Sequence, residues 1–191
     1  MLATYIQTRT SNPVLVRIIA IIGFAALTAI GAKISINLQP VPITLQVLAV
    51  LLAGLTLGAK DGAASQIAYV GAITAGLPLD QGGLGTAVWT KPSAGYLLGF
   101  IVGAFVAGYL AEKGMGQNRI LRFIAGLAGV VVIYLVGTAW LTYGFLGGDW
   151  AKGWQFGIAP FILVDVAKAV IASGIAEGLR LWLSRASGGQ A

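Results

Sequence analysis

The chain has 191 residues, of which 58% are apolar, and it carries only 12 basic and 6 acidic side chains. Soluble domains carry roughly a quarter charged residues, so a charged share of 9% excludes an ordinary soluble enzyme, a disordered tail and a collagen-like chain. Cysteine and histidine are absent from the sequence, which excludes disulfides, thiolate nucleophiles, sulfur-ligated metals and the usual zinc ligand and neutral-pH base. The composition predicts an all-α integral membrane protein with one domain.

The net charge of +6 has two interpretations. Basic residues gathered on one soluble face would favour nucleic-acid binding. Here they are spread in ones and twos between apolar runs, a pattern typical of residues that set orientation in a membrane. We therefore expect no nucleic-acid partner, and membrane lipid as the surroundings.

Apolar runs define the expected spans. A helix that crosses the bilayer needs about 20 apolar residues, because a hydrocarbon core of about 30 Å is covered at about 1.5 Å per residue. The runs predict six transmembrane helices, at residues 16–36, 43–58, 62–77, 93–111, 120–146 and 156–183. The first run is long for a signal peptide and further spans follow it, which favours a transmembrane helix. The second and third are short for complete crossings, so their ends are expected to lie among other helices.

Two connections have a distinct composition. Pro40 and Pro42 predict a turn that leads into the second helix, because proline fixes φ and lacks an N–H donor. Residues 78–92 are too polar and glycine-rich for a lipid-facing helix, and they form either a mobile loop or a structured lid over a site. Neither this segment nor residues 54–60 contains the phosphate-binding pattern GxxxxGK followed by Ser or Thr. The chain itself is therefore not expected to be an ATPase.

The distribution of lysine and arginine predicts the orientation. If the N-terminus is cytoplasmic, only Lys91 and Lys152 fall in outside loops, while Lys33 and Lys168 lie within spans. The remaining eight basic residues share the cytoplasmic side: Arg9, Arg17, Lys60, Lys113, Arg119, Arg122, Arg180 and Arg185. This bias predicts that the N- and C-termini are both cytoplasmic.

Asp165 and Lys168 are one helical turn apart in the sixth span, two to three turns from its outer end. A buried ion pair seldom adds net stability relative to apolar residues. It could fix helix packing, but a polar ligand explains it better, because the carboxylate accepts N–H groups and the ammonium donates to an oxygen. By contrast, Lys33 is placed to snorkel to the outer interface, and Glu177 with Arg180 is expected to form a local surface pair.

Small residues recur at a spacing of four. Ala25 and Ala29, with Ala32 further along, form a stripe on the first helix, and the pattern returns at Gly54/Gly58, Gly99/Gly103 and Gly174/Gly178. This spacing allows two helices to approach closely. Each pair therefore serves either packing within the bundle or contact with another protein.

Three strings resemble those of the BioY family, the biotin-specific substrate-binding (S) components of energy-coupling factor (ECF) transporters. They are PVPITLQ at 40–46, PSAGYLLGF at 92–100 and PFILVDVAKA at 160–169, and the likeness runs from about residue 23 to residue 172. The resemblance implies a multi-pass protein of a bacterial or archaeal cell membrane, with six transmembrane helices and a biotin pocket near the outer surface. It also implies no enzymatic activity and no cofactor.

The resemblance implies ligand-binding roles for Asp165 and Lys168, and we place Gln46, from the first string, among the expected ligand contacts. An apolar wall is expected from four aromatic residues, Tyr96, Trp89, Trp140 and Tyr143. For the carboxylate of biotin, Lys91 is the first candidate and Lys33 the second. An alternative assignment puts this carboxylate on Lys168.

Partners also follow from the resemblance: Ala25 and Ala29 would contact the transmembrane coupling protein, and separate ATPase subunits would supply energy. One departure is Lys91, which stands before Pro92 where many relatives have glycine. The alternatives are an S component for a different vitamin, a self-contained small-solute carrier, an intramembrane enzyme and a structural bundle. A carrier of inverted repeats should show matching broken helices in its two halves, which the sequence lacks. An enzyme would have only Asp165 with Lys168 for chemistry, and a structural role leaves that pair unexplained.

Overall fold

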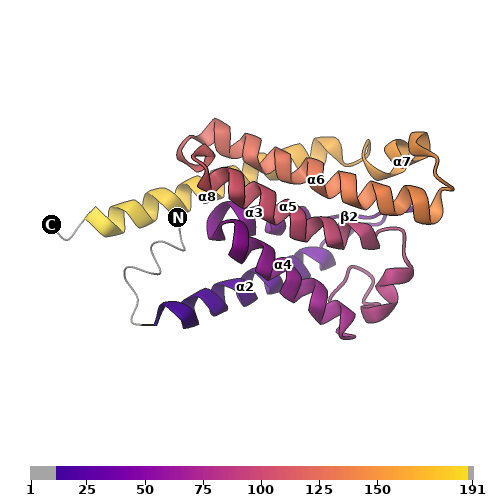
Figure 1. Ribbon diagram of the computed structural model, residues 1–191, viewed down its shortest axis with the longest axis horizontal. Coiled ribbons are helices and arrows are strands. Elements are labelled where there is room, and N and C mark those ends of the chain that lie inside the picture. Colours follow the sequence, from indigo (N-terminus) through magenta and orange to yellow (C-terminus); the bar gives the residue numbers. More distant parts are fainter. Residues whose placement is uncertain (1–11, 189–191) are drawn as a thin grey trace.

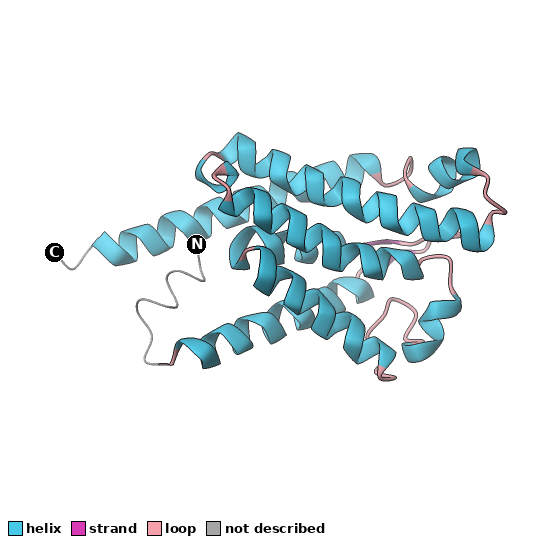
Figure 2. Ribbon diagram, viewed as in Figure 1, coloured by secondary structure: helices cyan, strands magenta, loops and turns pink. Residues whose placement is uncertain are grey.

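The computed structural model describes residues 12–188, so the expected cytoplasmic Arg9 lies outside the described residues. Helices account for nearly all of the fold, with one pair of very short strands (Figure 2). The long helices are α2 (Pro13–Lys33), α3 (Gln46–Leu57), α4 (Ala59–Thr74), α5 (Ala94–Glu112), α6 (Arg119–Phe145) and α8 (Ile162–Gly188). The shorter elements are β1 (Ser35–Ile36), β2 (Ile43–Thr44), the 3₁₀ helices η1 (Gly85–Thr90) and η2 (Met115–Gln117), and α7 (Trp150–Gly157). The start of α2 and the end of α8 lie at the same end of the bundle, on the left in Figure 1.

Helix α3 forms the centre of the bundle. It contacts α2, α4, α5, α6 and α8, and all but one of its residues are buried, as expected for a helix that is apolar on every side. Helices α2, α5 and α6 are long and apolar enough to cross a membrane, and α7 with α8 qualifies as one span bent by 52°. The short second span thus lies among other helices, as the sequence predicts.

The end of the first expected span and the start of the second differ from the ends of the observed helices α2 and α3. Helix α2 stops at Lys33 rather than residue 36, because Ser35 and Ile36 pair antiparallel with Thr44 and Ile43. The connection between these strands contains Pro40 and Pro42, neither of which can donate a backbone hydrogen bond. The proline-rich turn is therefore the loop of a hairpin, and α3 begins at Gln46 rather than residue 43.

Helix α4 begins at Ala59, three residues before the expected third span, directly after Gly58. Gly58 has φ +91, and a Cβ at this position would collide with the carboxylate of Glu112. Only glycine satisfies both conditions, since other residues rarely adopt positive φ. The α3–α4 corner is accordingly a direct turn between two helices.

The expected sixth span is not one continuous helix. Phe156 lies in α7, and Pro160 lies in the turn of residues 158–161 that separates α7 from α8. Proline inside a helix removes a hydrogen bond and clashes with the preceding turn, which accounts for the break. Helix α7 has its own cap: the Asp149 carboxylate accepts the Lys152 backbone N–H at 3.1 Å, and this contact lowers the pKa of Asp149 below its usual range.

Glycines allow α5 and α6 to form the most extensive helix pair. A Cβ on Gly99 would lie 3.0 Å from the carbonyl oxygen of Ile133, and one on Gly103 would lie 2.9 Å from that of Gly129. The Gly99/Gly103 spacing therefore serves internal packing. A Cβ on Gly174 or Gly178 would meet nothing within 4 Å, so that pair has no packing role within the described chain.

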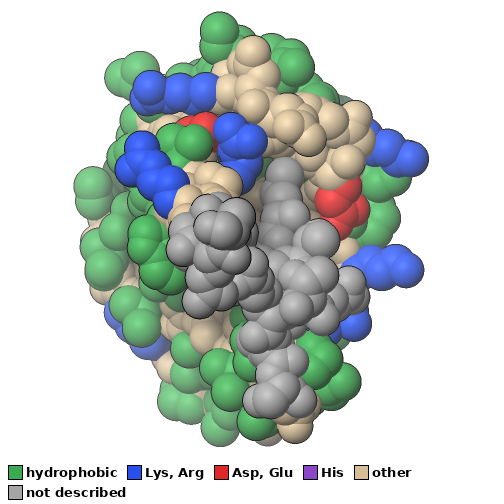
Figure 3. Space-filling model, turned by 90° about the vertical axis from the view of Figure 1, so that its left-hand side faces the viewer, with side chains coloured by type: hydrophobic (Ala, Val, Ile, Leu, Met, Phe, Trp, Pro, Cys, Tyr) green, Lys and Arg blue, Asp and Glu red, His purple; other side chains and the backbone are tan. Residues whose placement is uncertain are grey.

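The end of the bundle where α2 starts carries a buried arginine. Arg122 is 1% exposed, and its guanidinium donates to the carboxylate of Glu177 and to the carbonyl of Gly116. Glu177 also pairs with Arg180 at 2.9 Å, so the expected local surface pair is part of a larger network. Basic side chains outnumber acidic ones on this face (Figure 3).

Polar contacts join α2 to its neighbours at three levels, although the only buried residues of this helix are Thr28, Gly31 and Ala32. Arg17 binds Asp61 on α4 at 2.8 Å, and in the middle of the helix the Gln66 amide donates to the Thr28 hydroxyl at 3.2 Å. At its end, the Lys33 ammonium donates to the carbonyl oxygen of Asp80 at 2.6 Å. Thus α2 is joined to α4 and to the segment that follows α4.

Candidate ligand-binding site

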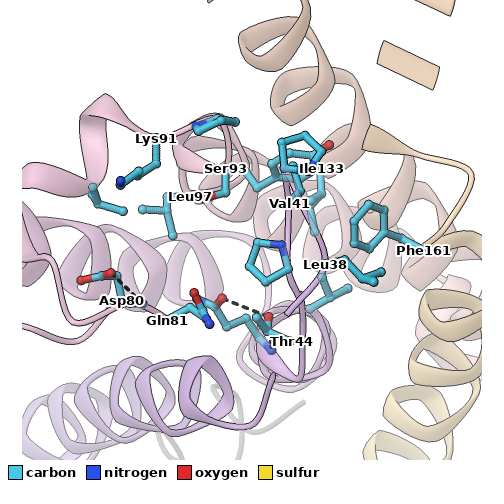
Figure 4. Close-up of a pocket in the computed structure, with 18 of the residues that line it drawn as sticks. Leu38, Val41, Thr44, Asp80, Gln81, Lys91, Ser93, Leu97, Ile133 and Phe161 are labelled. Atoms are coloured by element: carbon cyan, nitrogen blue, oxygen red, sulfur yellow. Dashed lines mark hydrogen bonds between the residues drawn. The ribbon is translucent and has the colours of Figure 1, made fainter. Parts of the chain in front are cut away.

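A cavity of about 330 Å³ lies at the end of the bundle opposite to the start of α2. Its walls come from the β1–β2 connection, from residues 80–93, and from α3, α5, α6 and α8. Figure 4 shows side chains of these segments directed toward one another around this space. The cavity therefore depends on elements that are far apart in the sequence.

The pair predicted from the sequence lines the buried side of this cavity. Asp165 and Lys168 are 2% and 4% exposed, and the Lys168 ammonium donates to Asp165 Oδ1 at 2.6 Å. Asp165 lies in the first turn of α8, where a negative charge is favoured by the helix dipole. The pair is thus formed and faces the cavity.

Tyr134, which the sequence analysis missed, completes this cluster. It comes from α6 and lines the cavity, and its hydroxyl donates to Asp165 Oδ2 at 2.8 Å. The sequence does contain one indication of Tyr134: it lies within an apolar span, and a tyrosine hydroxyl that is buried there needs a hydrogen-bond partner. Each carboxylate oxygen of Asp165 therefore has one donor from the protein and keeps further acceptor capacity.

Gln46, Tyr96 and Lys91 also line the cavity, as expected of ligand contacts. Gln46 already donates to the hydroxyl of Tyr69 at 2.7 Å, and the Tyr96 hydroxyl donates to the carbonyl of Gly157 at 2.7 Å. Tyr96 thus offers its ring rather than a free donor. Lys91 is exposed, and its ammonium has no hydrogen bond or ion pair within the part of the chain that the structure describes.

The prediction that four aromatic residues form the apolar wall is wrong for three of them. Trp89 and Trp140 pack edge to face, 6.4 Å between ring centroids, and Tyr143 is 69% exposed. None of the three lines the cavity, and neither does Lys33, whose ammonium holds the carbonyls of residues 78 and 80. Apart from Tyr96, the hydrophobic wall consists of Leu38, Val41, Val47, Leu84, Val88, Leu97, Phe100, Ile133 and Phe161.

The segment 78–92 is a structured cover rather than a simple connection. The Asp80 carboxylate accepts the backbone N–H groups of Gly82 at 3.0 Å and Gly85 at 2.9 Å. The Gln81 amide donates to Asn37 Oδ1 at 2.7 Å, which links this segment to the β1–β2 connection. Both segments contribute residues to the cavity, and in Figure 4 Gln81 lies between Asp80 and Thr44.

The chemistry available in this cavity is that of binding. Two buried carboxylates (Asp80 and Asp165), one buried ammonium (Lys168) and two buried tyrosines (Tyr96 and Tyr134) line the cavity together with hydrophobic side chains, an arrangement typical of a small-molecule site. Among residues 12–188, no group of three or more histidine, cysteine or acidic side chains is placed to hold a metal ion. The polar groups suit a ligand that has both N–H donors and an acceptor oxygen.

Comparison with known proteins identifies the family. The sequence model of the BioY family matches residues 6–185. The biotin transporter BioY of Thermotoga maritima is 42% identical over 158 residues, which are 82% of this chain and 91% of that protein. A probable biotin transporter BioY of Pyrococcus horikoshii is 41% identical over 160 residues, with the same shares of the two chains.

The fold is similar to that of a solved S-component for biotin from an ECF-type ABC transporter. The TM-score is 0.79 at 29% identity, and the match covers 91% of this chain and 95% of the other. This match establishes the S-component fold, which has six spans. The chain therefore belongs to the BioY family of multi-pass prokaryotic membrane transporters and is not an enzyme.

Proposed function

We propose that this chain binds biotin in the cavity of about 330 Å³ and mediates its uptake, energised by separate coupling and ATPase subunits of an ECF transporter. The observation that carries the proposal is the Asp165–Lys168 pair, which is buried and lines the cavity. The names of the relatives and of the matching solved structure support the same ligand.

Biotin fits the polar cluster chemically. Its ureido ring has two N–H donors and a strongly polarised carbonyl oxygen. The Asp165 carboxylate can accept hydrogen bonds from the ureido N–H groups. The Lys168 ammonium, which has three N–H groups, can donate to the ureido carbonyl oxygen. The thiophane ring and valeryl chain suit the hydrophobic wall, which includes Phe161 and Leu97.

The carboxylate of biotin has two candidate partners, Lys91 and Lys168, and a substitution of Lys91 shows which of them binds it. We expect Lys91→Gln to weaken biotin binding up to about fivefold, because an exposed ion pair contributes at most about 1 kcal/mol. Binding of biotin methyl ester should not change, since the ester carries no negative charge. Titration calorimetry on the purified protein measures both ligands.

The matched control is Lys152→Gln, which removes an exposed ammonium that does not line the cavity. It should leave both affinities unchanged. If Lys91→Gln weakens the acid and the ester equally, or has no effect on either, the carboxylate does not bind at Lys91 and the alternative assignment to Lys168 is favoured.

Two other functions remain as alternatives, an S component for a different vitamin and a self-contained small-solute carrier. Mass spectrometry of the ligand retained by the purified protein separates the first from our proposal, with biotin as the expected result. Uptake by vesicles that contain only this chain, without coupling and ATPase subunits, would favour the second.

We also propose that both termini are cytoplasmic, which places the cavity on the outer side. The chain has no cysteine, so single cysteines can be introduced without first removing native ones. Cysteine at Ala87, an exposed position beside the cavity, should react with a membrane-impermeant maleimide on intact cells. Cysteine at Gln117, an exposed position at the other end of the bundle, should react only after lysis. The reverse pattern would invert the orientation.

The partner surface is proposed to include Ala25 and Ala29. Both are half-buried, and both pack against the hydrophobic core, so the stripe lies at the edge of the exposed face of α2. Exposed Ile22 and Ala26 are neighbours of Ala25 and Ala29 on this helix. A partner helix that approaches this edge would contact both sets of side chains.

A further inference from the structure

A second cavity, of about 710 Å³, lies at the opposite end of the bundle from the biotin cavity. It is formed by the start of α2, the α3–α4 corner and the end of α5, which lie toward the left in Figure 1. The residues that line it are Pro13, Val14, Arg17, Leu57, Ala59, Lys60, Asp61, Phe105, Tyr109, Glu112 and Lys113. Nothing in the proposed biotin site uses these residues.

The acidic groups of this cavity are already engaged within the protein. The Glu112 carboxylate accepts the Ala59 N–H, at the start of α4, at 2.9 Å. The Asp61 carboxylate is bound by the Arg17 guanidinium at 2.8 Å. Asp61 is thus balanced by Arg17, whereas Glu112 accepts a neutral N–H group and keeps its charge, so the three cations and two carboxylates that line the cavity leave one net positive charge.

The two lysines of this cavity supply its excess positive charge. Lys60 and Lys113 are exposed, and within the described residues neither ammonium forms an ion pair. The Lys113 ammonium lies over the Tyr109 ring, 5.5 Å from its centroid, a weakly favourable cation–π contact. Two ammonium groups beside one cavity favour an anionic ligand.

The remaining wall is hydrophobic and exposed. Val14, Phe105 and Tyr109 are 65%, 42% and 45% exposed, and the two aromatic rings stack with 6.1 Å between centroids. Helix α5 carries this aromatic pair within its apolar span and Lys113 directly after its end. Positive charge thus lies at the membrane boundary, next to a hydrophobic surface at acyl-chain depth.

We propose that this cavity binds one anionic phospholipid. Its phosphate would lie between the ammonium groups of Lys60 and Lys113, and an acyl chain would lie along Phe105 and Tyr109. The attraction of anionic lipid for juxtamembrane lysines supports the charge match. A zwitterionic lipid satisfies the hydrophobic wall but leaves the excess positive charge unbalanced.

The test uses the full chain in nanodiscs that contain phosphatidylglycerol and phosphatidylcholine in equal amounts, followed by extraction and native mass spectrometry. Wild-type protein should retain one phosphatidylglycerol in preference to phosphatidylcholine. The double variant Lys60→Gln/Lys113→Gln should lose this preference by about tenfold. The matched control, Arg119→Gln/Arg185→Gln, removes two charges from the same end of the bundle outside the cavity, and it should retain the preference.

Biotin affinity, measured on the same preparations, reports whether each variant is folded, and it is expected to be unchanged. Equal retention of the two lipids by wild-type protein would overturn the proposal, as would an equal loss in both double variants. If Lys60→Gln/Lys113→Gln keeps the bound lipid but no longer co-purifies with the coupling protein, the cavity contacts a protein and the lipid assignment is wrong.

Discussion

Replacing Asp165 with asparagine is expected to weaken biotin binding at least about tenfold, the effect of losing a charged hydrogen bond of about 1.5 kcal/mol or more. The substitution removes an acceptor for the ureido N–H groups. It also leaves the Lys168 ammonium, which is 4% exposed, without its counter-ion. Lys168→Ala should have a comparable effect for the converse reason, since a buried unpaired charge is costly. Titration calorimetry measures both affinities.

Two further variants separate ligand binding from a purely structural ion pair. Tyr134→Phe removes one hydrogen bond to Asp165 but retains the pair, so a smaller loss of affinity is expected. Asp165→Asn/Lys168→Met removes both charges, which should restore thermal stability relative to either single variant without restoring binding. Wild-type affinity in folded Asp165→Asn and Lys168→Ala would contradict our assignment.

Tryptophan at both Ala25 and Ala29 is expected to abolish biotin uptake in cells that supply the coupling protein and ATPases. The reason is steric: small residues at a spacing of four allow close helix approach, and indole rings prevent it. Biotin binding to the purified variant should be retained, because neither alanine lines the cavity. Uptake of labelled biotin and calorimetry on the same variant give the two readouts.

The control for this experiment is Leu135→Trp, at a site on α6 that is 58% exposed. It adds an indole to a lipid-facing position and should change neither readout. Because Ala25 and Ala29 also pack against the core, the thermal midpoint of each variant is needed. Loss of both uptake and binding would mean that the stripe serves internal packing, and loss of neither would place it against lipid.

The sequence alone located the helices that are long, apolar and uninterrupted. Expected spans at 93–111 and 120–146 differ by one residue at each end from α5 and α6, because hydrophobic length largely determines where a chain enters and leaves a bilayer. The hairpin at residues 35–44 and the α7–α8 break were harder to predict. Each depends on tertiary packing around a proline rather than on composition.

The structure places five of the residues expected at the site around the cavity: Asp165, Lys168, Lys91, Gln46 and Tyr96. The other expected residues, Lys33, Trp89, Trp140 and Tyr143, lie outside it. Asp165 and Lys168 stand out because charge is rare within a span. Trp140 and Tyr134 are both on α6, but only Tyr134 lines the cavity. In a membrane helix both the lipid face and the protein face are apolar, so hydrophobic periodicity does not show which side faces inward. That rotation is set by the close contact of α5 with α6 through Gly99 and Gly103.

The three polar contacts of α2 have a mechanical consequence. Hydrophobic packing alone would hold this helix in place only weakly, because its exposed apolar surface contacts lipid equally well after a small displacement. A slide of one helical turn, about 5.4 Å, would separate Arg17 from Asp61, Thr28 from Gln66 and Lys33 from the Asp80 carbonyl simultaneously. The position of α2 along its own axis is therefore coupled to α4 and to the segment that covers the biotin cavity, because any axial displacement of α2 breaks contacts with both.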